Sequence, residues 1–237
     1  MKGKVYLVGA GVLGLENITL RAYNIISEAD VVLYDRLVDE DLLKIAKKAT
    51  KKIYVGKEPR EAEKQRDIID LMIKLAKEGF CVVRLKSGDP FIFGRGGEEL
   101  LSLQEAGVDV EVIPGLTSAV ALPTLAKIPL TMRGVSSSVV ILSGSLANSE
   151  DEKEYLMKHA KFPGTLVLLM SIRKLPFVAR NLIQGGADPE TPAAIITSVK
   201  HSIGKKTYRL KELADGLSKE KGPGVVVIGR VVEVFGK

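Results

Sequence analysis

Short runs of β-branched and aliphatic residues alternate with amphipathic segments along the whole 237-residue chain. This alternation is typical of an α/β protein, in which strands are joined by crossover helices. The first half predicts strands at residues 4–9, 30–34, 52–55, 81–85 and 108–113. Between them, residues 65–78 and 97–106 carry apolar side chains at helical spacing, and each segment ends at a glycine, Gly79 or Gly107, suited to capping a helix.

A polar, turn-rich stretch at residues 131–138 predicts a connector between two lobes. We therefore expect an N-terminal α/β lobe at 1–130 and a C-terminal α/β lobe at 131–237. The second lobe is predicted to hold strands at 139–142, 165–169, 193–199, 205–209 and 224–228, and helices at 150–160, 175–183 and 211–219.

Composition excludes several classes of function. No apolar run approaches the roughly 20 residues that span a bilayer, and the N-terminus lacks a signal-peptide core, so we expect a cytoplasmic protein. Cys81 sits in an apolar run, and His159 and His201 stand apart with no neighbouring His or Cys, so no metal site is predicted. The net charge of +6 comes from scattered lysines and does not by itself choose a partner.

A complete G-x-G-x-x-G, formed by Gly9, Gly11 and Gly14, follows the first strand, and Asp35 stands about 20 residues further on. This spacing would suit NAD, with glycines beside the pyrophosphate and a carboxylate on the ribose. Against it, the helical period begins near Thr19, with Asn17 or Thr19 as the N-cap. The glycines could equally serve a tight strand-to-helix turn, and both interpretations stay open.

The run VVRLKSGDPFIFGRGGEE at 82–99 is much more specific and closely resembles the signature of uroporphyrinogen-III C-methyltransferases, in the tetrapyrrole methyltransferase family. Further matches follow the same order along nearly the whole chain: YDRLV at 34–38, VGK at 55–57, PGLTSA at 114–119, IPLT at 128–131, TLVLLM at 165–170 and IGRVV at 228–232.

The resemblance implies two α/β lobes of the tetrapyrrole methyltransferase type, a homodimer, and S-adenosyl-L-methionine (product S-adenosyl-L-homocysteine) held in a cleft between the lobes. Carried over by position, the cofactor-binding residues would be Val12, Ser87, Gly88, Asp89, Ile92, Thr117, Ser118, Met170 and Val199. Gly88 would permit close backbone approach, Asp89 would accept from a ribose or amino group, and Ile92 and Met170 would supply apolar walls. Ordinary core packing is the alternative for Met170.

The family's acceptor is a polycarboxylate tetrapyrrole, for which fixed arginines are suited because a guanidinium binds a carboxylate with two parallel hydrogen bonds. Arg36, Arg95 and Arg133 stand in or beside the matching motifs and are the predicted substrate-binding residues, together with Glu98. Glu98 could fix an arginine, receive a proton, or only favour the start of a helix.

Asp35 and Lys57 match positions to which the family assigns acid and base roles, so they are the predicted catalytic pair. Their alternatives are a turn cap for Asp35 and a propionate contact for Lys57.

The chain departs from the family pattern at several loops. Residues 9–14 read GAGVLG where the family has GAGPGD, Ser87 replaces a glycine, and SGS at 143–145 replaces Thr-Gly-His. The loop 58–64 is shorter and more charged than in the family.

The expected reaction is C-methylation of uroporphyrinogen III to precorrin-2 for sirohaem- or cobalamin-type biosynthesis. The rival hypotheses are methylation of another tetrapyrrole or a protein side chain, an NAD-dependent oxidoreductase, and a nucleic-acid binder; we expect neither nucleic acid nor membrane as partner.

Overall fold

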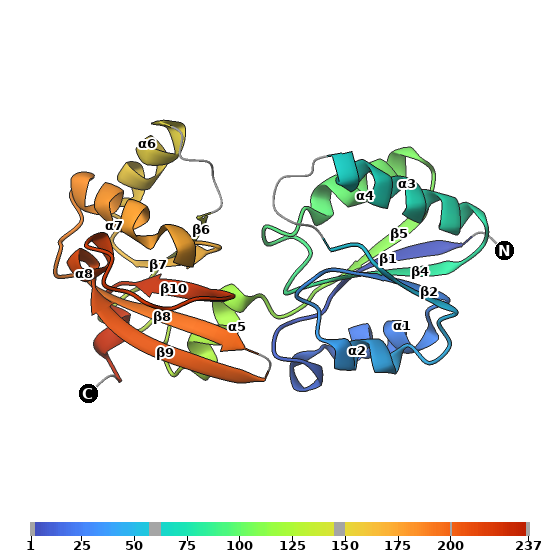
Figure 1. Ribbon diagram of the computed structural model, residues 1–237, viewed down its shortest axis with the longest axis horizontal. Helices are drawn as coiled ribbons and strands as arrows, with labels where there is room; N and C mark the ends of the chain where they lie inside the picture. Colours follow the sequence, from blue (N-terminus) through green and yellow to red (C-terminus); the bar gives the residue numbers. More distant parts are fainter. Residues whose placement is uncertain (1–2, 57–62, 145–149, 200, 236–237) are drawn as a thin grey trace. The chain divides into compact units, whose positions relative to one another are not determined.

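A computed structural model describes residues 3–56, 63–144, 150–199 and 201–235 (Figure 1). The chain divides into two compact units, Met1–Thr117 and Ser118–Lys237, each built around its own five-stranded sheet. Among the described helices, none is long and apolar enough to cross a membrane.

The first unit is a parallel sheet in the order β3-β2-β4-β1-β5. Its strands are β1 (Lys4–Gly9), β2 (Val31–Tyr34), β3 (Lys51–Tyr54), β4 (Cys81–Lys86) and β5 (Asp109–Ile113), and its helices are α1 (Leu20–Glu28), α2 (Glu40–Ile45), α3 (Glu63–Lys77) and α4 (Gly96–Glu105), with a 3₁₀ turn η1 (Leu15–Asn17) before α1.

Helices cover both faces of this sheet (Figure 1). The chain moves one way through β1, β2 and β3 and returns the other way through β4 and β5, so right-handed crossovers place α1 and α2 on one face and α3 and α4 on the opposite face. Ile26 of α1 and Leu42 of α2 pack on one side of the sheet, and Met72 of α3 and Leu103 of α4 pack on the other. The first unit therefore has three layers, with an apolar core on each face of its sheet.

The second unit is a mixed sheet in the order β6-β7-β10-β8-β9, in which only β6 and β7 are parallel among the described pairs. Its elements are β6 (Val139–Ser143), α6 (Glu150–His159), β7 (Thr165–Leu169), η2 (Ile172–Lys174), α7 (Leu175–Gln184), β8 (Pro192–Val199), β9 (Ser202–Arg209), α8 (Leu210–Ala214), β10 (Gly224–Ile228) and η3 (Arg230–Glu233). One core joins α6, α7 and α8 to the sheet.

The division between the units differs from the predicted boundary at residue 130. Helix α5 (Ser118–Leu125) packs against β7, β8 and β10, so the segment before the expected connector already belongs to the second unit. Ala119, Ala121 and Leu122 are buried in this helix. Residues 131–138 instead form a turn inside that unit, where the Met132 amide donates to the Ser136 carbonyl.

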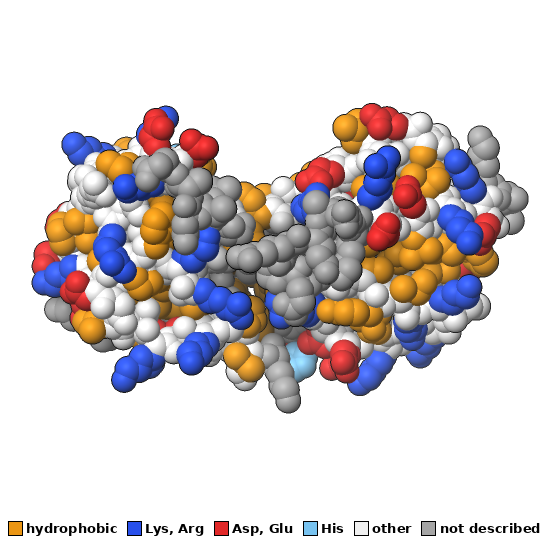
Figure 2. Space-filling model, turned by 45° about the horizontal axis from the view of Figure 1, so that its top comes forward, with side chains coloured by type: hydrophobic (Ala, Val, Ile, Leu, Met, Phe, Trp, Pro, Cys, Tyr) orange, Lys and Arg blue, Asp and Glu red, His pale blue; other side chains and the backbone are white. Residues whose placement is uncertain are grey.

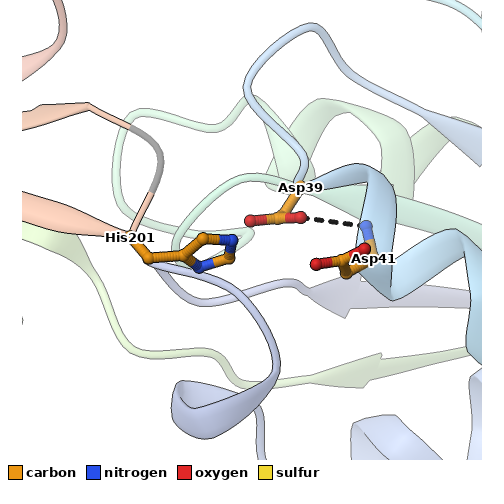
Figure 3. Close-up of side chains that lie close together, drawn as sticks. All are labelled: Asp39, Asp41 and His201. Atoms are coloured by element: carbon orange, nitrogen blue, oxygen red, sulfur yellow. Dashed lines mark hydrogen bonds between the residues drawn. The ribbon is translucent and has the colours of Figure 1, made fainter.

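Two other differences have local causes. Helix α2 was not predicted; it is six residues long, and the carboxylate of its N-cap residue Asp39 accepts from the Asp41 amide at 2.9 Å (Figure 3). Helix α8 is shorter than the predicted 211–219, because Gly216 adopts a positive φ of 77° just after it.

Candidate active site

The predicted site residues of the first unit lie in loops that leave the carboxyl ends of its parallel strands. Strand β4 stands between β2 and β1, and the helix after β4 covers the opposite face from the helices after its two neighbours. In open α/β sheets, ligands bind at the strand ends where neighbouring connections leave toward opposite faces. The topology therefore selects the loops after β1, β2 and β4 as the place for a site.

Backbone segments converge closely at this edge. The amides and carbonyls of Gly11 and Gly88 exchange two hydrogen bonds, at 3.1 and 2.9 Å. A Cβ on Gly115 would stand 2.2 Å from the Gly88 carbonyl oxygen, and one on Gly9 would stand 2.5 Å from the Gly115 amide nitrogen. Glycines at these positions therefore allow three loops to pack closely against each other. This agrees with the interpretation in which the first glycine motif forms a tight turn.

The dinucleotide interpretation of that motif fails on geometry. Helix α1 begins only at Leu20, after η1, and Thr19 caps it by accepting from the Ala22 amide at 3.2 Å. The glycine turn therefore leads into η1 and not directly into α1, whereas the dinucleotide motif places its glycines at the start of the crossover helix. The prediction that the helical period starts at Thr19 is confirmed.

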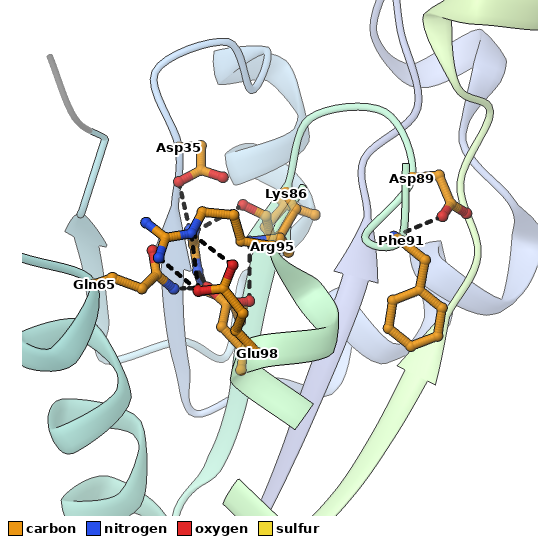
Figure 4. A network of polar contacts seen from close by, with 10 residues as sticks. Asp35, Gln65, Lys86, Asp89, Phe91, Arg95 and Glu98 are labelled. Carbon is orange, nitrogen blue, oxygen red and sulfur yellow. Dashed lines mark hydrogen bonds and ion pairs between the residues drawn. The ribbon is translucent and has the colours of Figure 1, made fainter. Parts of the chain in front are cut away.

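Asp89 holds the loop that follows β4. Its Oδ1 accepts from the Phe91 amide at 2.8 Å and its Oδ2 from the Gly115 amide at 3.1 Å (Figure 4). Each carboxylate oxygen has further lone-pair capacity, so this anchoring leaves room for a ligand donor. The loop also turns through two residues with positive φ, Phe93 at 52° and Arg95 at 57°, a conformation that costs free energy in non-glycine residues.

Arg95 and Glu98 form an exposed bidentate ion pair at the start of α4. The Nε of Arg95 donates to Glu98 at 3.1 Å and its Nη2 at 2.5 Å, and the two side chains are about half exposed. The carboxylate raises the pKa of the Arg95 guanidinium above its ordinary value. The geometry matches two of the three alternatives for Glu98, because it fixes Arg95 and also lies in the first turn of α4.

A buried polar cluster lies beneath the loop and was not predicted. Arg84 and Lys86 of β4 are 2% and 3% exposed, and Glu99 of α4 is fully buried. The Glu99 Oε1 accepts from the Arg84 Nε at 3.2 Å and from the Gln65 Nε2 at 2.9 Å, and its Oε2 lies 2.9 Å from the Lys86 Nζ. Burial, and next the charge of Arg84, lower the pKa of Lys86, while Glu99 opposes this shift.

Asp35 joins this cluster from the end of β2. Its Oδ1 accepts from the Nη2 of Arg84 at 2.5 Å, and its side chain keeps 30% of its surface exposed (Figure 4). Asp35 is therefore the member of the cluster that best reaches solvent. Its predicted partner Lys57 lies outside the described residues.

The other predicted contacts lie in loops or at the ends of helices and strands. In the first unit, Val12 follows β1, Ser87 and Ile92 follow β4, Arg36 is exposed after β2, and Thr117 closes the unit. In the second unit, Ser118 begins α5, Arg133 is exposed in its turn, and Met170 and Val199 lie at the ends of β7 and β8. Met170 is 51% exposed with a φ of 56°, which excludes core packing as the reason for this methionine.

Comparisons with known proteins agree over nearly the whole chain. Residues 4–199 match the family model of tetrapyrrole (corrin/porphyrin) methylases. The uroporphyrinogen-III C-methyltransferase of Methanocaldococcus jannaschii is 45% identical over 99% of both chains, and that of Bacillus subtilis is 41% identical over 97% of this chain and 91% of its own. The structure resembles uroporphyrin-III C-methyltransferase from Thermus thermophilus complexed with S-adenosylhomocysteine, with a TM-score of 0.85 and 41% identity over 98% of this chain and 100% of that one.

Proposed function

The chain belongs to the tetrapyrrole methylase family, and on this premise we propose that it transfers methyl groups from S-adenosyl-L-methionine to carbon atoms of uroporphyrinogen III, giving precorrin-2. The observation that carries the proposal is the identity of 41–45%, over nearly full length, to uroporphyrinogen-III C-methyltransferases. The two α/β units are of the type found in the structural relative.

The residues at the strand ends fit the cofactor chemically. Ser87 and Asp89 supply a hydroxyl and a carboxylate for ribose or amino groups, and the exposed side chains of Ile92, Met170 and Val199 supply apolar surface for an adenine. Bound there, S-adenosylmethionine supplies an electrophilic methyl group on a positively charged sulfur. The protein's main contribution is alignment of the two reactants, which can be worth roughly 7–11 kcal/mol.

Exposed arginines suit the acceptor. Arg36 and Arg95 stand above the strand ends of the first unit, and Arg133 stands in the second. On the face shown in Figure 2, Lys and Arg side chains are spread among acidic and apolar ones and form no continuous basic surface. Individual arginines would then bind the carboxylates of the acceptor. Glu98 would hold Arg95 in a fixed orientation.

Asp35 is the base that we propose for the proton released after attack by the pyrrole carbon. Its carboxylate is partly exposed, and Arg84 fixes one of its oxygens. Lys57 remains the second catalytic residue of the proposal. We also propose a homodimer in the cytoplasm, with the product serving sirohaem or cobalamin formation.

The cofactor assignment is tested by calorimetry with S-adenosylhomocysteine and with NAD on the whole protein. We expect saturable binding of S-adenosylhomocysteine and no measurable heat with NAD, because the glycine turn does not open the crossover helix α1. Incubation with S-adenosylmethionine and enzymatically made uroporphyrinogen III should then give a product whose mass has increased by whole methyl groups. Tight NAD binding with none of S-adenosylhomocysteine would overturn the proposed function.

The acceptor assignment is tested by Arg95→Met and Arg133→Met. Each change removes a charge-assisted bidentate contact of about 1.5–3 kcal/mol, so activity at low acceptor concentration should fall roughly ten- to a hundredfold. Added salt should weaken binding of the acceptor more than binding of the methyl donor, because exposed charges are screened.

The control for both variants is Arg21→Met, which removes an exposed arginine of the first unit that pairs with Glu111. Its activity should match that of the unaltered protein. Loss of S-adenosylhomocysteine affinity in the Arg95 or Arg133 variant, with normal acceptor affinity, would reverse the proposed roles of donor and acceptor sites.

A further inference from the structure

Strand β4 carries two buried cations on one face. Arg84 and Lys86 alternate with Val83 and Leu85, which pack into the core beneath α1 and α2, so the two cations face the layer of α3 and α4. A charge removed from water is destabilising unless a partner compensates it. Arg84 and Lys86 bring two positive charges, and Glu99 and Asp35 bring two negative ones, so this cluster of described residues is formally neutral.

Polar contacts link the core to Asp35 through Glu99 and Arg84. Gln65 donates to Oε1 of Glu99, Lys86 forms an ion pair with its Oε2, and the Nε of Arg84 donates to the same Oε1. Because the guanidinium is planar, fixing its Nε edge also fixes the direction in which Nη2 donates. That Nη2 donates to Asp35 Oδ1 at 2.5 Å.

The exposure of the cluster members falls steeply away from Asp35. The side chain of Asp35 is 30% exposed, that of Arg84 3%, and that of Glu99 is fully buried. A residue as enclosed as Arg84 has almost no surface with which to contact a ligand. Any influence of Arg84 on the reaction therefore has to pass through a neighbour, and Asp35 is the charged neighbour that reaches solvent.

We infer that Arg84 is the positioning residue for Asp35, and that Glu99 with Gln65 and Lys86 locks the orientation of Arg84. The inference rests on the proposed function, because it assigns Asp35 the role of base. Reacting groups must be held within about 0.5 Å of the productive geometry, and an aspartate at a strand end has rotamer freedom that a fixed guanidinium removes. The cluster links β4, α3 and α4 to the turn after β2 that carries Asp35. Its contacts join side chains that are 34 (Gln65–Glu99), 15 (Arg84–Glu99) and 49 (Arg84–Asp35) residues apart in the sequence.

The test is a double-mutant cycle between Arg84→Met and Asp35→Asn. Arg84→Met should lower kcat roughly ten- to a hundredfold while the KM for uroporphyrinogen III and the affinity for S-adenosylhomocysteine stay within about twofold. The double variant should be no slower than Asp35→Asn alone, because two residues that act as one unit are not additive. Arg84→Lys keeps the charge but cannot bridge Asp35 and Glu99, so it should recover only part of the lost turnover.

Two outcomes would overturn the inference: losses of kcat that multiply in the double variant, or an Arg84→Met protein that has lost cofactor affinity as well as turnover. If Arg84→Met does not fold, the paired change Arg84→Gln with Glu99→Gln removes one charge of each sign and leaves the cluster neutral, and the same cycle is measured with it. Failure of the unaltered protein to methylate uroporphyrinogen III would instead overturn the proposed function, so the two failures are distinguishable.

Discussion

Replacing Glu99 with glutamine is expected to lower the free energy of unfolding by about 3–5 kcal/mol, the usual cost of removing one partner from a buried ion pair. The side chain of Glu99 is fully buried, and its two oxygens face Arg84, Gln65 and Lys86. Glutamine has nearly the same shape, so the loss would come from charge and not from a cavity. Urea unfolding followed by circular dichroism measures it.

The physical reason is an uncompensated charge. With Glu99 neutral, Arg84 and Lys86 bring two positive charges to the cluster and Asp35 supplies only one negative charge. An amide nitrogen would also point a donor at groups that are donors themselves. Adding Lys86→Met to Glu99→Gln restores a neutral cluster, so the double variant should regain a large part of the lost stability.

The pH dependence of the Glu99→Gln variant has a definite sign. Burial and the charge of Arg84 already lower the pKa of Lys86, and loss of Glu99 removes a contact that raises it. A lysine with a lowered folded-state pKa binds fewer protons in the folded protein than in the unfolded chain. Stability therefore increases as the pH rises from the folded-state pKa toward the ordinary value of 10.5. The variant should therefore recover stability relative to the unaltered protein as the pH rises toward 10.5.

Glu98→Gln is the matched control, because it alters the neighbouring carboxylate on the same helix. Glu98 pairs with Arg95 at the surface and is 56% exposed, and surface pairs of this kind contribute about 0–1 kcal/mol. Equal destabilisation by the two variants would mean that the buried cluster does not carry the stability assigned to it.

The strands and the main helices could be predicted because their signals are local. Strands β1, β7 and β10 have the predicted bounds, since each is a short apolar run, and Gly9 and Gly229 mark the ends of β1 and β10. Thr19 was a candidate cap because its hydroxyl needs only the next turn of helix for a partner. Helix α5 gave no such signal: its residues are apolar on all sides and Pro123 interrupts them, so no 3.6-residue period is visible.

The buried cluster could not be derived from local pattern, although one signal was present. Arg84 and Lys86 are charges at alternate positions of an otherwise apolar strand, and charges on the buried face of a parallel strand need partners from elsewhere in the chain. Which residues supply them depends on the strand order and on the faces that α3 and α4 cover. The family resemblance placed Asp35 in the site, whereas the residue that holds it was found from the fold.

Asp35→Asn is expected to lower kcat by about 10²–10⁴-fold, the range in which positioned general bases contribute. Asparagine keeps an oxygen that can accept from Arg84. Because the side chain at this position is 30% exposed, unlike that of Glu99, water screens the charge that is lost, so the protein should still fold. The affinity for S-adenosylhomocysteine and the KM for uroporphyrinogen III should change little. What asparagine cannot do is remove the proton left on the pyrrole carbon after methyl attack.

Asp39→Asn is the control for this variant, because Asp39 lies in the same segment and caps α2 (Figure 3), a position that asparagine fills as well as aspartate does. Its turnover should equal that of the unaltered protein. For Asp35→Asn itself, a normal kcat with a raised KM for the acceptor would contradict the proposed role. Asp35 would then bind the macrocycle, and another group would remove the proton.

Stopped-flow turnover at saturating acceptor separates these two cases, because the loss of a base slows the reaction even when every site is filled.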